Sequence, residues 1–134
     1  MQKDWKEFEG GPNKSFRNRI RVTLSPKGMI LLNRIAYQAL EEPQAVVLLF
    51  DENERTIGLK PADPTRQNAF PIKQKDHYHN RTIATNSFCR HYNLIPTRTI
   101  LFNNAEVDND GVLRLELRET IAVGGTRRPT RAKV

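Results

Sequence analysis

Residues 27–40 read KGMILLNRIAYQAL, a pattern that predicts a turn, a short strand, a helix cap and a short helix in succession. Gly28 suits the turn because glycine adopts a positive φ without steric cost. The apolar run 29–32 is too short for a helix. Asn33 is a good N-cap, since its side chain accepts a hydrogen bond from an amide of the first helical turn. The residues that follow at the spacing of one helix face are Ile35, Ala36, Ala39 and Leu40.

A hairpin is predicted after this helix. Pro43 ends the helix, and residues 45–50 form a continuous apolar run of the kind that lies buried in a sheet. The polar residues 51–54 predict a turn, and residues 56–59 return as the second strand.

The same pattern recurs in the second half of the chain. Four residues have a counterpart 53 positions later: Ile30 with Ile83, Asn33 with Asn86, Ile35 with Phe88, and Pro43 with Pro96. A fixed period of this kind indicates an internal repeat. We therefore predict a mainly β domain over residues 16–123 that contains two ββαββ units, at 16–61 and 68–118, each with one short helix.

The second unit yields its own predictions. Residues 81–85 form a short strand, and Thr85 or Asn86 caps a helix over 87–93. Residues 97–107 form one long strand, which leads into a hairpin turn at 108–111 with Gly111 at a position suited to positive φ. Inside this unit, Phe70 and Ile72 are expected to point toward the core, and Lys73 and Lys75 away from it.

Length and composition set limits on the class of protein. The chain has 134 residues, which suits one domain, and a single cysteine, Cys89, so the fold cannot depend on an internal disulfide. No window resembles a membrane span, and the N-terminus lacks the apolar segment of a signal peptide, which favours the cytoplasm. Residues 1–15, with Trp5 and Phe8, are expected to form a flexible arm, and residues 124–134 a basic, disordered tail.

The net charge of +7 is unevenly distributed along the chain. A basic block (Arg17, Arg19, Arg21, Lys27 and Arg34) precedes an acidic block (Glu41, Glu42, Asp51, Glu52 and Glu54). The second half repeats this order, with Lys73, Lys75, Arg81, Arg90 and Arg98 before Glu106, Asp108 and Asp110. A fold that superposes the two halves would carry one positive side that attracts a polyanion. The alternative is two ordinary solvated faces.

Residues 15–24 alternate between apolar and basic side chains, which predicts a half-buried strand. Its open face would carry Arg17, Arg19 and Arg21, spaced about 6.6 Å apart. This spacing is close to the phosphate repeat of a nucleic-acid strand. The alternative is that the three arginines pair with acidic side chains of a neighbouring strand.

The segment 22–40, together with Ile57-Gly58-Leu59-Lys60-Pro61, resembles the AbrB-like swapped-hairpin transcription factors. Two such units in one chain are similar to the MraZ branch of that family, and the resemblance covers about residues 17–117. It implies a pseudo-dimeric barrel of two interlocked units that binds double-stranded DNA through a basic β-rich face, as a transcriptional regulator or an antitoxin-like protein.

The candidate DNA contacts combine this resemblance with the chemistry of cations on a rigid sheet, which neutralise phosphates and read guanine edges. They are Arg17, Arg19, Arg21, Lys27, Arg34, Lys73, Lys75, Arg81, Arg90 and His91, with Arg127 and Arg128 of the tail. The alternative function is a non-catalytic assembly subunit that docks to a protein partner through the arm with Trp5 and Phe8 or through the acidic hairpins. The sequence leaves open whether the chain forms a homo-oligomer.

Catalytic and metal-dependent chemistry find little support in the sequence. His77, His79, Cys89 and His91 are metal-ligand types, but Cys89 and His91 lie two apart on the predicted helix and point in different directions. A metal site with three ligands that include His77 and His79 is the remaining alternative. Cys89 is expected to be a small core residue, and no nucleophile with a base, or phosphate-binding glycine loop, is found. We therefore expect a protein that is not an enzyme and uses no cofactor.

Overall fold

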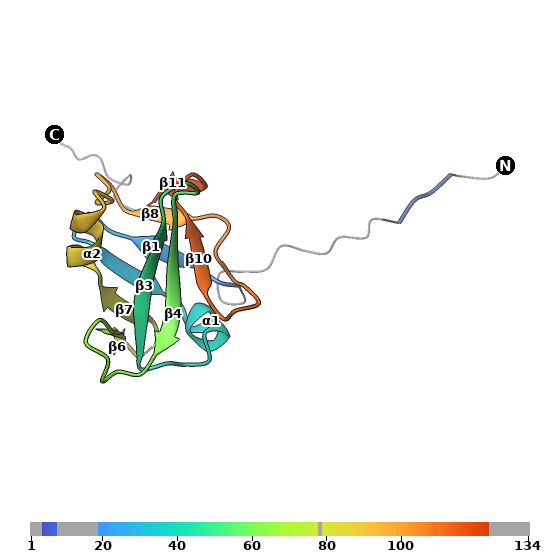
Figure 1. Ribbon diagram of the computed structural model, residues 1–134. Coiled ribbons are helices and arrows are strands. Elements are labelled where there is room, and N and C mark those ends of the chain that lie inside the picture. Colours follow the sequence, from blue (N-terminus) through green and yellow to red (C-terminus); the bar gives the residue numbers. More distant parts are fainter. Residues whose placement is uncertain (1–3, 8–18, 78, 124–134) are drawn as a thin grey trace.

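The computed structural model describes residues 4–7, 19–77 and 79–123, which form two antiparallel sheets and two short helices (Figure 1). The six-stranded sheet consists, in spatial order, of β11 (Thr120–Ala122), β8 (Ile100–Phe102), β1 (Val22–Leu24), β2 (Met29–Leu32), β7 (Arg81–Ala84) and β6 (Lys73–Gln74). The five-stranded sheet consists of β5 (Phe70–Pro71), β3 (Ala45–Asp51), β4 (Thr56–Ala62), β10 (Leu113–Glu116) and β9 (Glu106–Val107). The helices are α1 (Arg34–Ala39) and α2 (Asn86–His91).

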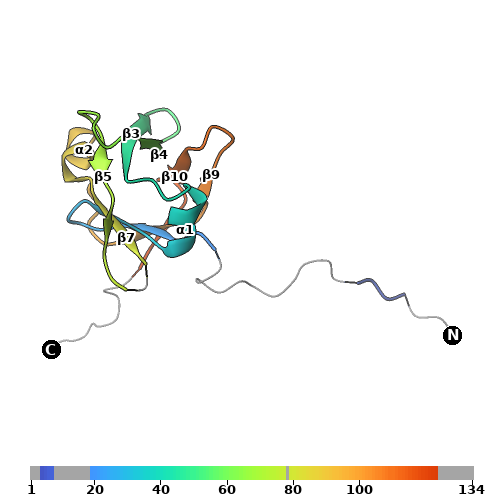
Figure 2. The ribbon, with the colours of Figure 1, turned by 90° about the horizontal axis from the view of Figure 1, so that it is seen from below.

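One hydrophobic core lies between the two sheets. The six-stranded sheet contributes Leu24, Ile30 and Ile83, and the five-stranded sheet contributes Ile57 and Leu113, all of them fully buried. Figure 2 shows the two sheets as separate layers, with the helices at their margins. The described strands form two open sheets, so the mainly β prediction is confirmed, while the closed barrel is not found among them.

The first predicted segment folds as its local chemistry requires. Gly28 has a φ of +76°, and Asn33 caps α1 by accepting a hydrogen bond from the Ala36 amide at 2.9 Å. The Asn33 side chain also accepts from the Arg21 amide at 3.1 Å and donates to the Arg19 carbonyl at 2.7 Å. Asn33 therefore fixes both the start of α1 and the chain that leads into β1.

The strand predicted over residues 15–24 is shorter than expected. β1 contains only three residues, in which Val22 and Leu24 are buried as predicted. Thr23, expected on an open face, is only 6% exposed; it lies in the middle of the sheet, paired with Leu31 of β2 and Leu101 of β8. Most of the arm, the 124–134 tail and Arg17 lie outside the described residues. Within 4–7, Trp5 is 83% exposed.

The start of α2 corrects the predicted helix cap. Thr85 occupies the N-cap position but its side chain makes no capping bond. Its hydroxyl instead donates to the Gly28 carbonyl at 2.8 Å, and the Asn86 side chain donates to the Lys27 carbonyl at 3.1 Å. These two bonds tie the start of α2, in the second half of the chain, to the turn at Gly28 in the first half.

The single long strand predicted over residues 97–107 is wrong. The chain runs as β8 in the six-stranded sheet, turns at Asn103 and Asn104, and continues as β9 in the five-stranded sheet. Asparagine favours turns because its side chain competes for backbone hydrogen bonds. The turn is held by the Asn103 amide, which donates to the Glu119 carbonyl at 2.8 Å. β11, which no pattern predicted, pairs with β8 beyond this turn.

Candidate nucleic-acid interface

The six-stranded sheet has an outer face that can be derived from its register. Ile30 and Ile83 point into the core, so their neighbours Leu31 and Thr82 point outward. The register continues this outer row across all six strands, through Ile121, Leu101, Thr23, Leu31, Thr82 and Lys73. Lys73 is exposed and forms the end of the row on the edge strand β6.

A second row of outward-facing residues lies at the end of the same sheet, where α1 begins. The Asn33 amide donates to the Arg21 carbonyl at 3.1 Å, and the Lys75 amide donates to the Asn80 carbonyl at 2.8 Å. These bonds extend the β1–β2 and β6–β7 ladders by one pair each. Arg21 and Lys75, each two residues from an outer-row member, therefore lie on the outer side of opposite halves of the sheet.

We call this region the α1 end of the six-stranded sheet. The backbone carbonyl of Arg19 lies here, since it accepts a hydrogen bond from the Asn33 side chain, and Arg34 is the exposed first residue of α1. Lys73 lies two residues before Lys75 on β6. Among the described residues, Arg34, Lys73 and Lys75 form no salt bridge, so a polyanion would meet these charges without displacing a carboxylate.

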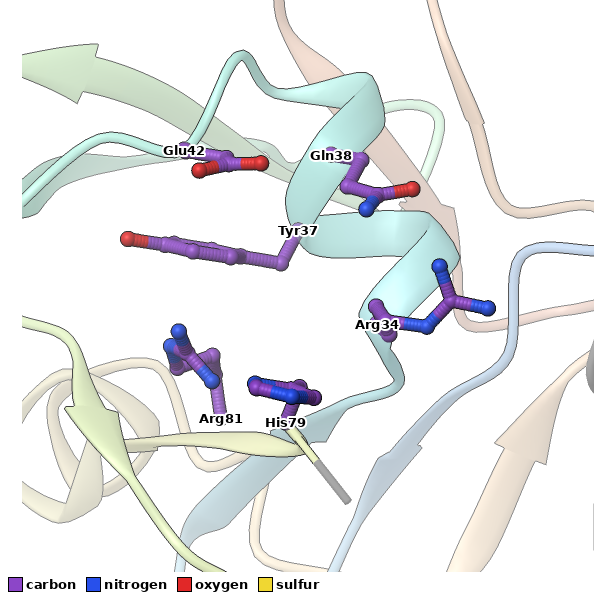
Figure 3. A pocket seen from close by; sticks show the side chains of 6 residues that line it. All are labelled: Arg34, Tyr37, Gln38, Glu42, His79 and Arg81. Atoms are coloured by element: carbon purple, nitrogen blue, oxygen red, sulfur yellow. The ribbon is translucent and has the colours of Figure 1, made fainter. Parts of the chain in front are cut away.

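A pocket of about 250 Å³ opens at the α1 end (Figure 3). Its lining comes from both halves of the chain: Arg34, Tyr37, Gln38, Glu42, His79 and Arg81. Arg81 and His79 point from the β7 side toward α1, and Tyr37 lies between Arg81 and Glu42. Arg81 and His79 therefore form the β7 wall of the pocket, and the α1 wall carries Tyr37, Gln38, Glu42 and Arg34, whose guanidinium points away from Arg81.

Arg81 lies on the inner side of the sheet, because it neighbours the outward Thr82. Its guanidinium carbon lies 4.3 Å from the centre of the Tyr37 ring, a cation–π contact, and the Tyr37 hydroxyl donates to the Pro43 carbonyl at 3.0 Å. The Nη1 atom of Arg81 is buried and has no hydrogen-bond partner among the described residues. Buried polar atoms in folded proteins are nearly always bonded, so this atom calls for an explanation.

Two residues of the pocket also have an unusual backbone. Glu42 has a φ of 56° and His79 a φ of 69°. Both lie in the left-handed region, which residues other than glycine rarely adopt. Such conformations cost about 1–3 kcal/mol each and cluster at binding sites. The fold therefore holds both side chains at the pocket in a conformation that their sequence does not favour.

The other candidate contacts lie elsewhere. Lys27 precedes Gly28 at the opposite end of the four-pair β2–β7 ladder, about 10 Å away. Arg90 and His91 are exposed on α2, the helix that begins against that turn. Arg17, Arg127 and Arg128 lie outside the described residues. The candidates therefore form one group at the α1 end and a smaller one near α2.

The acidic residues lie mainly on the other sheet. The turn at 51–54 joins β3 to β4, and the turn at 108–111 joins β9 to β10, both in the five-stranded sheet. The two turns are at opposite ends of that sheet, since β4 and β10 pair antiparallel. The acidic turns thus lie on the five-stranded sheet, while most of the basic candidates lie on the six-stranded sheet.

The metal-ligand types of the sequence do not gather. Among the described residues, no group of three or more histidine, cysteine or acidic side chains is placed to hold a metal ion. Cys89 is fully buried, as expected of a core residue, and its sulfur lies 3.5 Å from the Thr85 hydroxyl. Burial raises the pKa of the Cys89 thiol, since charge is disfavoured away from water.

The raised pKa of Cys89 leads to a prediction about alkaline stability. The native state holds the thiol proton more tightly than the unfolded chain, so the stabilisation is present below the unfolded pKa and is lost as pH rises through the folded pKa. Between the thiol pKa of the unfolded chain and that of the folded chain, we expect the unfolding free energy of the natural chain to fall with pH more steeply than that of Cys89→Ala. The difference in slope should be up to about 1.4 kcal/mol per pH unit. Urea denaturation from neutral to alkaline pH measures this difference. Parallel profiles would contradict it.

Sequence patterns did not identify the pocket. They do not mark Tyr37, Gln38 or Glu42 as binding residues, and they point to His79 only as a metal ligand. The spacing of Arg34 and Tyr37 places them on one helix face, which was the only local signal. The opposite wall comes from β7, and no pattern within α1 predicts that contact.

Comparisons of the chain with family models, with curated proteins and with solved structures give no match. Neither helix within the described residues has the length and apolar character that a membrane crossing requires.

Proposed function

We propose that this protein binds double-stranded DNA with the outer face and the α1 end of its six-stranded sheet, as an AbrB-like regulator or antitoxin built from two swapped-hairpin units. The observation that carries the proposal is the convergence of Arg21 and Arg34 from one half of the chain with Lys73 and Lys75 from the other. Lysine and arginine side chains neutralise phosphates, and each contact releases counterions.

The dimensions of the sheet support this mode of binding. β1 and β6 are separated by β2 and β7, so Arg21 and Lys75 lie about 14 Å apart across the sheet. The major groove of B-DNA is about 12 Å wide. Basic side chains on both sides of the sheet can therefore reach the two phosphate backbones that border a groove, while the strands between them face the bases.

The pairing of β2 with β7 supports the repeat. Ile30 pairs with Ile83, the residue 53 positions later, which is the offset of the sequence matches. Two equivalent strands that pair antiparallel about equivalent residues are what a local twofold axis produces. The β4 and β10 strands, the last hairpin strands of each unit, also pair antiparallel.

The proposal predicts a salt-dependent interaction with duplex DNA. For Lys73→Gln/Lys75→Gln we expect the slope of log affinity against log salt to decrease by about 2, because each lost phosphate contact removes about 0.9. Fluorescence anisotropy of a labelled duplex at several salt concentrations measures the slope.

The matched control removes two cations from elsewhere. Lys60 lies on β4 and Arg66 in the loop after it, and both are exposed. Lys60→Gln/Arg66→Gln changes the net charge equally, so its slope should stay close to that of the natural chain. Equal slopes for the two double variants, or no binding at low salt, would overturn the proposal.

A further inference from the structure

The pocket between α1 and β7 has the composition of a site for a sugar phosphate. We propose that Arg81 and His79 bind the phosphate group, and that Glu42 and Gln38 accept hydrogen bonds from hydroxyl groups of the sugar. The sugar phosphate is either a free metabolite or a unit of a bound nucleic-acid strand. This inference concerns the pocket alone and does not require the outer face of the sheet to bind DNA.

The basic wall supplies the phosphate contacts. Arg81 is held in place by the Tyr37 ring at 4.3 Å, and its buried Nη1 atom has no hydrogen-bond partner among the described residues. A phosphate oxygen would provide the missing acceptor, and the planar guanidinium suits paired bonds to phosphate. No described acid pairs with Arg81, so the phosphate would supply its counter-charge.

The opposite wall limits the ligand to one that carries hydroxyl groups. A bare oxyanion would fill only the β7 side of the pocket, next to Arg81 and His79, and would leave the hydrogen-bond acceptors of the α1 side unused. A carboxylate accepts hydrogen bonds and cannot donate them when ionised, so it favours a ligand with hydroxyl donors. The volume of about 250 Å³ is slightly below that of pockets for drug-sized molecules, which suits a phosphate with a few carbon atoms.

Two pocket residues have a positive φ, which allows binding to be tested apart from folding. Glu42 and His79 lie on different segments and line opposite walls, yet both have a positive φ. The same conformation occurs outside the pocket, at Glu41, Arg55 and Asn93, and Glu42 adopts it directly after the end of α1. Glycine at either position would relax the backbone and remove the side chain, which separates binding from folding in an experiment.

Titration calorimetry of the full chain with ribose 5-phosphate tests the inference, with inorganic phosphate and ribose as comparison probes. We expect saturable binding of ribose 5-phosphate that is at least about tenfold tighter than that of inorganic phosphate, and no binding of ribose. Arg81→Gln should weaken binding at least about tenfold, in line with the loss of a charged hydrogen bond. His79→Gly should also weaken it while the midpoint of thermal unfolding stays equal or rises, so a loss of binding is not a loss of fold.

The control is Lys73→Gln/Lys75→Gln, which leaves the pocket intact and should bind ribose 5-phosphate within about twofold of the natural chain. Competition with duplex DNA distinguishes the two sources. If the pocket holds a nucleotide unit of the bound DNA, ribose 5-phosphate displaces the DNA. If the pocket holds a free metabolite, the DNA stays bound. Absence of saturable ribose 5-phosphate binding, or equal weakening by the lysine double variant, overturns the inference. The salt slope of DNA binding is measured separately, so either proposal can fail without the other.

Discussion

Replacing Gly28 by alanine should lower the free energy of unfolding by about 3 kcal/mol. A Cβ atom at Gly28 would lie 2.8 Å from the Cα of Asn86, a backbone atom that cannot move without shifting the start of α2. Overpacking of this kind costs about 1–3 kcal/mol. The φ of +76° adds about 1–2 kcal/mol for a residue with a side chain. Urea denaturation followed by circular dichroism measures the loss.

Gly111 provides the matched control for this substitution. Its φ of +79° is almost the same, but a Cβ atom there would meet nothing within 4 Å. Gly111→Ala should therefore show only the conformational cost of about 1–2 kcal/mol. The difference between the two variants isolates the contact with Asn86. Equal losses would mean that this contact adds nothing and that the turn can move away from α2.

The contact matters because it joins the two halves of the chain. The Gly28 carbonyl accepts from both the amide and the hydroxyl of Thr85, at 2.9 and 2.8 Å, so the turn of the first half is bonded to the helix start of the second. The hydroxyl of Thr85 is buried, and a buried donor needs a partner. Glycine at position 28 is thus required twice, by its own φ and by the neighbour that it allows to approach.

The local chemistry of the sequence was sufficient for the first half of the fold. Gly28 and Asn33 act through their own backbone preference and side-chain reach, over a few residues, and both roles are confirmed. The inward positions of Val22, Leu24 and Ile30 follow from the period of a strand. Such features depend on short distances in the chain, which sequence patterns describe well.

The errors occur where a distant segment decides between local alternatives. Residues 97–107 contain enough apolar residues for one strand, but β8 pairs with β1 and β9 with β10, so the chain has to cross between sheets at Asn103. Thr85 was a plausible helix cap, yet its hydroxyl bonds to a carbonyl 57 positions earlier. The pocket depends in the same way on β7 lying beside α1. Periodicity contains no information on these pairings.

Replacing Ile83 by alanine should lower the free energy of unfolding by about 2–5 kcal/mol, the range for removing a large buried aliphatic side chain. Ile83 is fully buried and pairs with Ile30 in the middle of the β2–β7 ladder, and it belongs to the core shared by both sheets. Thr82→Ala is the matched control on the same strand, since Thr82 points to the outer face and leaves no core cavity. We expect it to cost under about 1 kcal/mol.

The more informative readout for Ile83→Ala is where stability is lost. The two halves share the β2–β7 and β4–β10 ladders and a single core, so neither half has a complete hydrophobic interior of its own. Amide hydrogen exchange should therefore show protection falling by the same free energy in β3, from the first half, as in β10, from the second. Undiminished protection in β3 would mean that the first half folds alone. Equal loss in both would mean that the two units interlock into one cooperative domain, which a face assembled from both halves requires.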